Sequence, residues 1–186
     1  MRTALYDAAH NIIPVLKNNK KYRGPLEFVG PICETTCKFI KYNKYQSLNQ
    51  SDYVAIADDS GLCVKILNHE PGILSARYAK KCGGWYEAMK KIYSRVETKQ
   101  NPDFSAKFTS CLSLKFCDGR IFTYNGEIQG RITWPPKGDN GFGYDPFFIP
   151  MDENLTYGEV EYSKKILTDH RSVAFKKLSE VHLKSS

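Results

Sequence analysis

Apolar residues recur at helical spacing in several segments of the chain. The stretch WYEAMKKIYSRVE, residues 85–97, has the clearest pattern and predicts an internal helix. Residues 169–183 repeat apolar positions in a similar way and predict a closing helix, with Asp169 as its N-terminal cap. Weaker patterns over residues 10–22 and 37–48 predict two earlier helices. We therefore expect helices toward both ends of the chain and in its middle.

Short apolar runs between these helices predict strands. Residues 25–30, 53–57 and 62–67 are brief runs, and the last two flank the polar stretch DDSG. Residues 106–116 and 120–132 are longer β-prone runs, which the turn-forming sequence CDGR joins as a hairpin. No repeat, low-complexity tract or linker interrupts the series, so the pattern predicts a mixed α/β architecture.

Length and composition agree with a single domain over residues 1–186. This length suits one hydrophobic core. Apolar residues at 41% and charged residues at 25% are ordinary values for a globular protein. The first residues contain no apolar run long enough for a secretory signal or a membrane span, so we expect a cytoplasmic protein with no membrane partner.

The six cysteines are expected to be reduced thiols. A chain of this size without an export signal does not resemble a small secreted disulfide scaffold. No CxxC pair occurs, and Cys33 and Cys37 lack histidines at zinc-finger spacing. We therefore expect no structural zinc site.

The formal net charge of +7 indicates a polyanionic partner. Nucleic acid and a phosphorylated small molecule both satisfy this condition. Charge alone does not choose between them.

The stretch ADDSGL places two acids where an apolar strand ends. Asp58 and Asp59 are adjacent, so their carboxylates are expected to point to opposite sides and to serve different purposes. An acid fixed in this way can hold Mg²⁺ through its oxygens or activate a water molecule. The alternative is an acidic turn between two strands, with Asp58 as a cap and Gly61 at a positive φ.

The stretch EPGILSARYA brings a cation and hydroxyl groups close to the same strand end. A Pro-Gly turn precedes Ser75, and Arg77 and Tyr78 follow. Arg77 can clamp a phosphate or a carboxylate if its side chain points inward. It forms a surface ion pair if its side chain points outward.

The stretch GDNGFGYDPFF combines residues that are useful for binding a planar ligand. Its glycines allow close backbone approach, its aromatic rings offer flat faces, its acid supplies an acceptor, and its proline stiffens the exit. These residues are Gly138, Gly141, Gly143, Phe142, Tyr144, Asp145 and Pro146. Such a loop can stack a base and bind its edge, and the alternative is a β-turn with core aromatics.

A third polar group lies at the entrance to the closing helix. Lys165, His170 and Arg171 gather there. Arg171 and His170 can donate hydrogen bonds to a carbonyl oxygen, and Lys165 can neutralise a phosphate. Taken alone, the group is also a common basic helix start.

These motifs together resemble the inosine/xanthosine triphosphate pyrophosphatase family. ADDSGL, EPGILSARYA, GEIQGRITWPPKGDNGFGYDPFFIP and EVEYSKKILTDHRSVAFKKL stand in the family's order and at similar spacing, from about Tyr53 to Leu178. The resemblance implies a long central mixed sheet flanked by helices and a homodimer. It also implies Mg²⁺-dependent hydrolysis of a deaminated purine nucleoside triphosphate, such as ITP, dITP or XTP, to the monophosphate and pyrophosphate.

The resemblance also implies roles for individual residues. Asp59 matches the catalytic acid and a metal ligand, and Ser60 beside it matches a substrate-binding residue. Phe142 is expected under the base, with Gly143, Tyr144 and Asp145 around it. Lys165 is expected to face the nucleotide. The pair His170 and Arg171 is expected to bind the 6-oxo group, which leaves the amine of adenine without an acceptor.

The first 50 residues depart from the family pattern. The family begins with a strand and a phosphate-binding loop, Ser/Thr-x-Asn-x-x-Lys, and this chain has MRTALYDAAHN, with Leu5 and Ala8 where Asn and Lys belong. In a second family motif, Glu-Asn-Ala-x-x-Lys, Lys41 matches the lysine as a substrate-binding residue, and Glu34 lies upstream as a further metal ligand. Asp169 stands in place of the serine before the His-Arg pair.

Three functions remain open at this point. The first is an active pyrophosphatase, in which Lys38, Lys41 or Lys44 replaces the missing phosphate-loop groups. The second is a weakened homologue that binds purine nucleotides without efficient turnover. The third is a basic nucleic-acid-binding module, indicated by the net charge alone, whose binding would weaken steeply with salt. We expect the first, because the DDSG, GFGYDP and His-Arg motifs are all present.

Overall fold

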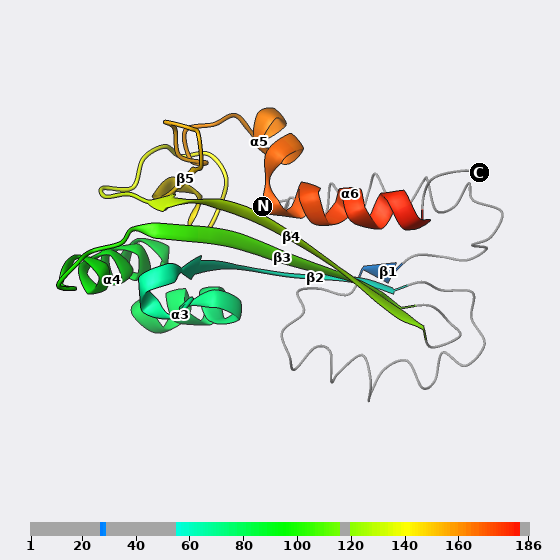
Figure 1. Ribbon diagram of the computed structural model, residues 1–186, viewed down its shortest axis with the longest axis horizontal. Coiled ribbons are helices and arrows are strands. Elements are labelled where there is room, and N and C mark those ends of the chain that lie inside the picture. Colours follow the sequence, from blue (N-terminus) through cyan, green and yellow to red (C-terminus); the bar gives the residue numbers. More distant parts are fainter. Residues whose placement is uncertain (1–26, 29–54, 116–119, 183–186) are drawn as a thin grey trace. The chain divides into compact units, whose positions relative to one another are not determined.

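The computed structural model describes residues 27–28, 55–115 and 120–182 (Figure 1). These residues fall into two compact units. Of the described residues, the first unit contains 27–28, 55–59, 111–115, 120–125 and 174–182. The second unit contains residues 60–110 and 126–173. The predicted helices at 10–22 and 37–48, and the residues Glu34 and Lys41, lie outside the described residues.

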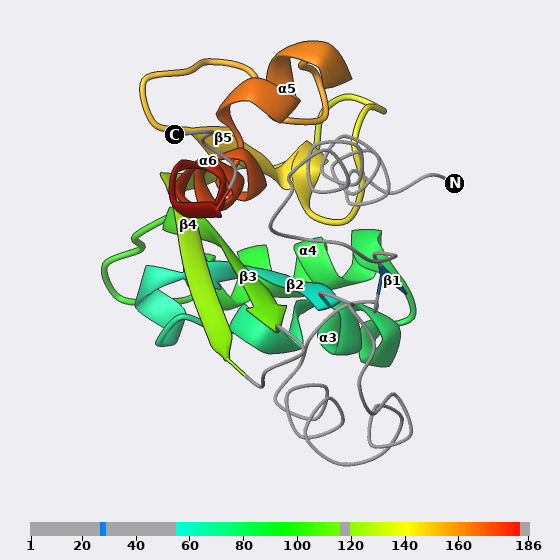
Figure 2. The ribbon, with the colours of Figure 1, turned by 90° about the vertical axis from the view of Figure 1, so that its right-hand side faces the viewer.

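The strands of the described residues form one mixed sheet of five strands, in the order β1-β2-β3-β4-β5 (Figures 1 and 2). Strand β1 (Glu27–Phe28) pairs in parallel with β2 (Ala55–Val64), with Glu27 opposite Ala55. Strand β5 (Phe148–Pro150) pairs antiparallel with β4, with Phe148 opposite Ile132. Parallel and antiparallel pairs in one sheet confirm the predicted α/β class with a mixed sheet.

Several elements match the ranges expected from the sequence. Helix α4 covers Trp85–Glu97, the predicted residues. Strands β3 (Ser105–Lys115) and β4 (Ile121–Ile132) match the two long β-prone runs. Helix α6 (His170–His182) is the closing helix. The hairpin turn expected between β3 and β4 includes residues 116–119, which are not described.

The expectation of two strands separated by an acidic turn at DDSG is wrong. Residues 55–64 form the single strand β2, which continues through Asp58 to Gly61. The residues predicted as strand from 65 onward form a short 3₁₀ turn, η1 (Lys65–Leu67). The chain turns at Asn68 and His69, which have φ values of 53° and 65°. Asn accepts this left-handed conformation readily, so the turn signal lies there and not in the acids.

Two further 3₁₀ turns and two further helices complete the described residues. The 3₁₀ turn η2 (Gly72–Leu74) leads into α3 (Ser75–Cys82), which ends at Gly83 with a φ of 93°. The 3₁₀ turn η3 (Asp145–Phe147) precedes β5. Helix α5 (Tyr162–Thr168) precedes α6 directly. None of the helices within the described ranges is long and apolar enough to cross a membrane.

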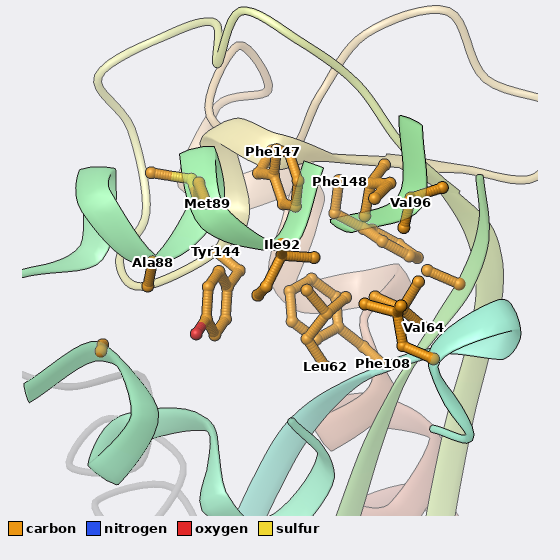
Figure 3. Packing of buried hydrophobic residues seen from close by; sticks show 14 of the residues in the cluster. Leu62, Val64, Ala88, Met89, Ile92, Val96, Phe108, Tyr144, Phe147 and Phe148 are labelled. Atoms are coloured by element: carbon orange, nitrogen blue, oxygen red, sulfur yellow. The ribbon is translucent and has the colours of Figure 1, made fainter. Parts of the chain in front are cut away.

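The second unit has a continuous hydrophobic core (Figure 3). Helix α4 contributes Ala88, Ile92 and Val96, which recur at intervals of four and so lie on one face. Side chains from β2, β3 and the segment around β5 pack against this face. They include Leu62, Val64, Phe108, Phe147 and Phe148. Each large side chain buried in this way stabilises the fold by about 1.5–3 kcal/mol.

The first unit contains the end of α6 and the start of β4. The hydroxyl of Tyr124 and Nε2 of His182 are 2.6 Å apart, and the Lys177 Nζ donates to the Asn125 carbonyl oxygen at 2.7 Å. Ala174 and Leu178 are the fully buried residues of this part of α6. Val181, which the sequence pattern placed with the apolar positions, is 64% exposed.

Candidate functional site

The two adjacent acids of β2 differ in burial. In β2, neighbouring side chains point to opposite faces. The Asp58 side chain is buried, at 1% exposure, whereas Asp59 and Ser60 are half-buried. The expectation that Asp58 and Asp59 point to opposite sides is confirmed. Asp59 is thus the acid of this pair that solvent or a ligand reaches.

Gly61 is required by a backbone contact and not by a positive φ. A Cβ at Gly61 would lie 2.0 Å from the Gly72 carbonyl oxygen, so no side chain fits there. The Ser75 hydroxyl secures the same contact, since it donates to the Gly72 oxygen at 2.7 Å and accepts from the Leu62 N–H at 3.0 Å. The Pro-Gly turn is therefore anchored on β2 beside Ser60. Arg77 is exposed on α3.

The glycines of the segment Gly138–Pro146, here named the aromatic loop, adopt a left-handed backbone conformation. Gly138, Gly141 and Gly143 have φ values of 81°, 75° and 66°. Such values are readily available only to glycine. They allow the Phe142 N–H to donate to Asp145 Oδ2 at 2.7 Å, which closes the loop on itself.

The two aromatic residues of the loop point to different surroundings. Tyr144 is 3% exposed and lies among the core side chains (Figure 3). Its ring packs edge-on against Trp85, with ring centroids 5.1 Å apart. Its hydroxyl donates to the Ser75 carbonyl oxygen at 3.4 Å, and burial raises its pKa. Phe142 is 36% exposed. Tyr144 thus anchors the loop in the core, and Phe142 presents its ring at the surface.

A buried ion pair links the aromatic loop to α5. Lys165 Nζ lies 2.6 Å from Asp145 Oδ2, and both side chains are 3% exposed. Burial raises the pKa of the Asp145 carboxyl, while the positive charge of Lys165 and the Phe142 N–H oppose that rise. One carboxylate oxygen therefore holds both Lys165 and the backbone of Phe142.

Two cations lie over the exposed ring of Phe142. Lys165 Nζ and the guanidinium carbon of Arg171 are each 5.1 Å from the centre of that ring. Lys165 Nζ also lies 5.3 Å from the centre of the Tyr157 ring. These distances are typical of cation–π interactions. The structure thus brings together Phe142, Asp145, Lys165 and Arg171, four residues to which the family resemblance assigns roles in substrate binding.

His170 belongs to the same group and is neutral. It is 2% exposed, and its ring stacks on Phe108 with centroids 4.9 Å apart. Burial, followed by the charges of Arg171 and Lys165, lowers its pKa well below 6.5. Arg171 Nη1 lies 3.3 Å from His170 Nε2, and a guanidinium only donates, so Nε2 is the acceptor. The proton of the neutral ring is then on Nδ1.

The Nδ1 atom of His170 is a buried polar atom without a hydrogen-bond partner among the described residues. Unpaired buried donors of this kind are rare in proteins, because their desolvation is not compensated. His170 therefore carries a buried donor that no group of the described residues satisfies.

Asp169, which replaces a family serine, has a structural role here. Its Oδ1 accepts from the Ser172 N–H at 2.8 Å and lies 3.0 Å from the Ser172 hydroxyl. This is the geometry of an N-terminal helix cap, so the predicted cap of α6 is confirmed. The carboxylate oxygen is thus directed toward the helix backbone.

Phe108 and Tyr157 are neighbours of the site that the sequence analysis did not identify. Phe108 lies under the ring of His170, and Tyr157 lies against Lys165. The buried positions of β3 alternate, and this pattern contains Phe108, but it does not show which ring the side chain meets. Tyr157 stands in a turn, where no periodic signal exists.

The described residues contain no group of three or more His, Cys, Asp or Glu side chains arranged to hold a metal ion. Asp59 supplies one half-buried carboxylate on β2. Carboxylate oxygens are the ligands that hard divalent cations prefer, and Mg²⁺ commonly takes only one or two of them together with water and phosphate oxygens. The chemistry of Asp59 therefore suits such a cation.

Comparison with known proteins places these features in a family. The Ham1 family model matches residues 14–181. The dITP/XTP pyrophosphatase of Zymomonas mobilis is 41% identical over 126 residues, which cover 67% of this chain and 60% of that protein. The dITP/XTP pyrophosphatase of Caulobacter vibrioides is 43% identical over 124 residues, which cover 67% and 64%. The chain thus spans about three fifths of the length of the curated relatives it matches.

Solved structures show the same similarity. A HAM1 protein from Coxiella burnetii superposes with a TM-score of 0.73 at 28% identity, over 94% of this chain and 92% of that one. The Ham1 protein of Staphylococcus aureus gives a TM-score of 0.65 at 33% identity, over 73% and 68%.

Proposed function

Since this chain belongs to the Ham1 family, we propose that it hydrolyses deaminated purine nucleoside triphosphates to the monophosphate and pyrophosphate. The relatives compared above are named dITP/XTP pyrophosphatases, and their names supply the substrate class. Deaminated purines carry an oxygen at carbon 6, where adenine carries an amine. In the reaction, water attacks the α-phosphorus, and the bond from that phosphorus to the oxygen bridging the α- and β-phosphates breaks. The bridging oxygen leaves with pyrophosphate.

The donor on Nδ1 of His170 is the observation that carries the proposal. A 6-oxo group accepts a hydrogen bond, so it satisfies this buried donor. The 6-amino group of adenine only donates in the plane of the ring, and it would leave Nδ1 without a partner. Sites built to pair a polar group reject analogues that leave the group unpaired by large factors.

The neighbours of His170 support a planar, electron-rich ligand. Phe142 presents a partly exposed ring on which a purine can stack. Lys165 and Arg171, which lie over that ring, add only hydrogen-bond donors. Gly143 allows close approach of the loop backbone, and Asp145 holds Lys165 in place.

We assign the chemistry of the reaction to Asp59. Its half-buried carboxylate is suited to orient and deprotonate the attacking water, or to bind a divalent cation. Mg²⁺, held by Asp59 and by Glu34, would neutralise charge on the phosphates when bound. Ser60 and Lys41 are proposed to contact the phosphates. We also propose that the chain acts as a cytoplasmic homodimer, which size-exclusion chromatography with light scattering tests for its oligomeric state.

Pyrophosphate release tests the proposal directly. Purified chain is incubated with Mg²⁺ and either ITP or ATP, and pyrophosphate is measured. We expect release from ITP to exceed release from ATP by roughly 100-fold or more, because adenine leaves the His170 donor unpaired. Asp59→Asn serves as the control for a contaminating hydrolase.

Two outcomes contradict the proposal. Equal rates with ITP and ATP would show that the His170 donor does not select the base. Absence of pyrophosphate, with inosine monophosphate still bound in a calorimeter, would show that the chain binds purines without turnover.

A further inference from the structure

The turn Thr156–Glu159, here named the brace, makes a reciprocal pair of hydrogen bonds within itself. The Thr156 N–H donates to Glu159 Oε2 at 2.9 Å, and the Glu159 N–H donates to Thr156 Oγ1 at 3.2 Å. This pattern is the one seen in capping boxes, where it rigidifies four residues. Thr156 is fully buried, at 0% exposure. The brace is therefore a rigid unit whose hydroxyl is shielded from water.

The brace holds the aromatic loop at its beginning. The hydroxyl of Thr156 donates to the Lys137 carbonyl oxygen at 2.7 Å, immediately before Gly138. The Lys137 N–H in turn donates to the Pro146 carbonyl oxygen at 2.8 Å, which joins the two ends of the loop. One side-chain hydroxyl of the brace thus fixes the point where the loop closes.

The brace also holds the middle and the end of the loop through its backbone. The Asn140 N–H donates to the Gly158 oxygen at 2.9 Å, and the Gly158 N–H donates to the Asp145 oxygen at 3.1 Å. The contact is so close that a Cβ on Gly138 would lie 2.0 Å from the Gly158 oxygen. A Cβ on Gly158 would lie 2.4 Å from the Lys137 oxygen. Both glycines are therefore required by the contact between these two segments.

The ring of Tyr157, in the middle of the brace, reaches the cation of the site. Lys165 Nζ is 5.3 Å from its centre, and the Tyr157 N–H donates to the Phe148 oxygen at 3.0 Å. The brace thus sets both the loop that carries Phe142 and Asp145 and the aromatic surface against Lys165.

We propose that Thr156 and Glu159 are positioning residues for purine recognition, which act through the aromatic loop and do not touch the substrate. The proposal rests on the proposed function, because it assigns a determinant of substrate affinity in the same site. It separates affinity from chemistry, since none of the hydrogen bonds of the brace involves Asp59.

The test replaces the hydroxyl of Thr156 and retains its shape. Thr156→Val removes the bond to the Lys137 carbonyl and the acceptor of the Glu159 N–H, whereas Thr156→Ser keeps both. Thr123→Val is the matched control, because Thr123 is exposed on β4 and its hydroxyl lies 3.1 Å from Ser113 Oγ, outside the brace. Glu159→Ala, at a half-buried position, removes the other hydrogen bond of the brace, which runs from the Thr156 N–H to Glu159 Oε2.

Two measurements are made on each full-length variant. Hydrogen–deuterium exchange of the ligand-free chain is followed by mass spectrometry, and KM and kcat are measured for ITP. For Thr156→Val we expect faster exchange confined to residues 137–146 and a KM raised about tenfold, with kcat within about twofold of wild type. Glu159→Ala should also speed exchange in these residues and raise KM, but by smaller amounts. Thr156→Ser and Thr123→Val should have exchange rates and KM values close to those of wild type.

The outcomes distinguish this proposal from the proposed function. For Thr156→Val, unchanged exchange in residues 137–146, or a fall in kcat without a rise in KM, overturns the positioning role. Neither result contradicts the proposed pyrophosphatase activity. If the wild-type chain releases no pyrophosphate, the proposed function fails. The affinity of each variant for inosine monophosphate, measured by calorimetry, then replaces KM, and wild-type affinity in Thr156→Val overturns the positioning role.

Discussion

The residues proposed to read the base and the residues proposed to perform the chemistry are held in different ways. Phe142, Lys165 and His170 come from three segments and contact one another directly or through shared neighbours. Asp59 and Ser60 are neighbours on the single strand β2, whose alternation gives their side chains opposite directions. The proposed base-binding group is therefore assembled from several segments, whereas the proposed catalytic acid belongs to one strand. The two groups should respond differently to substitution.

The largest expected effect sharpens this contrast at β2. Asp59→Asn should lower pyrophosphate release by roughly 1,000-fold, because it removes the only charge of the proposed water-activating group. Its thermal unfolding midpoint should stay close to wild type. Asp58→Asn should instead lower the thermal unfolding midpoint and have a much smaller effect on turnover than Asp59→Asn, since Asp58 is buried at 1% exposure. Equal effects of both substitutions on turnover would remove the distinction between the two faces of the strand.

The next effect probes the packed group. Lys165→Met leaves the buried Asp145 carboxylate without its cation, so the free energy of unfolding should fall by about 3–5 kcal/mol. The double variant Asp145→Asn, Lys165→Met should recover most of that loss, because no buried charge then remains. Urea titrations of Lys165→Met, Asp145→Asn and the double variant measure the coupling. If the two substitutions simply add, the pair is not coupled as the 2.6 Å distance indicates.

A third effect depends on pH and concerns His170. Its pKa is lowered in the folded state. Below pH 6.5 the His170 ring therefore binds a proton in the unfolded chain but stays neutral in the folded chain. The free energy of unfolding should therefore decrease as the pH falls, by up to about 1.4 kcal/mol per pH unit below 6.5. His170→Gln should flatten this dependence in urea titrations at several pH values. His69→Asn, at an exposed histidine, should leave it unchanged.

The smallest effect concerns the anchor of the aromatic loop. Tyr144→Phe removes the hydroxyl that donates to Ser75 and keeps the ring against Trp85. We expect a loss of about 1 kcal/mol in the free energy of unfolding. Tyr86→Phe is the matched control, because Tyr86 is 56% exposed. A larger loss in Tyr86→Phe would contradict the assignment of Tyr144 as the anchor.

Elements with a regular period were predictable from the sequence, and the contacts between them were not. Helix α4 has the predicted bounds because its buried residues recur at helical spacing. The cap at Asp169 also follows from local chemistry. The continuous strand at residues 55–64 was missed because DDSG has turn composition, although its backbone stays extended. The pairing of Asp145 with Lys165 joins residues 20 positions apart on different elements, and no local pattern contains it.

The candidate residues divide in the same way. The motifs identified Phe142, Asp145, Lys165, His170 and Arg171, and the structure brings these five together in the second unit. The motifs did not show that the Tyr144 side chain points into the core. A glycine-rich loop has no regular apolar period that separates its buried positions from its exposed ones. Thr156 and Tyr157 carry no chemical signal of their own, and their importance comes from the segments they contact.

The position of Trp85 makes it an intrinsic fluorescence probe of the aromatic loop. The sequence contains two tryptophans, Trp85 and Trp134. A Cβ on Gly143 would lie 3.6 Å from the Trp85 indole, whose edge-on partner is Tyr144. In Trp134→Phe, tryptophan emission therefore comes from a single indole beside the loop. Its intensity and wavelength during rapid mixing with nucleotide would then follow the loop in real time, without any attached dye.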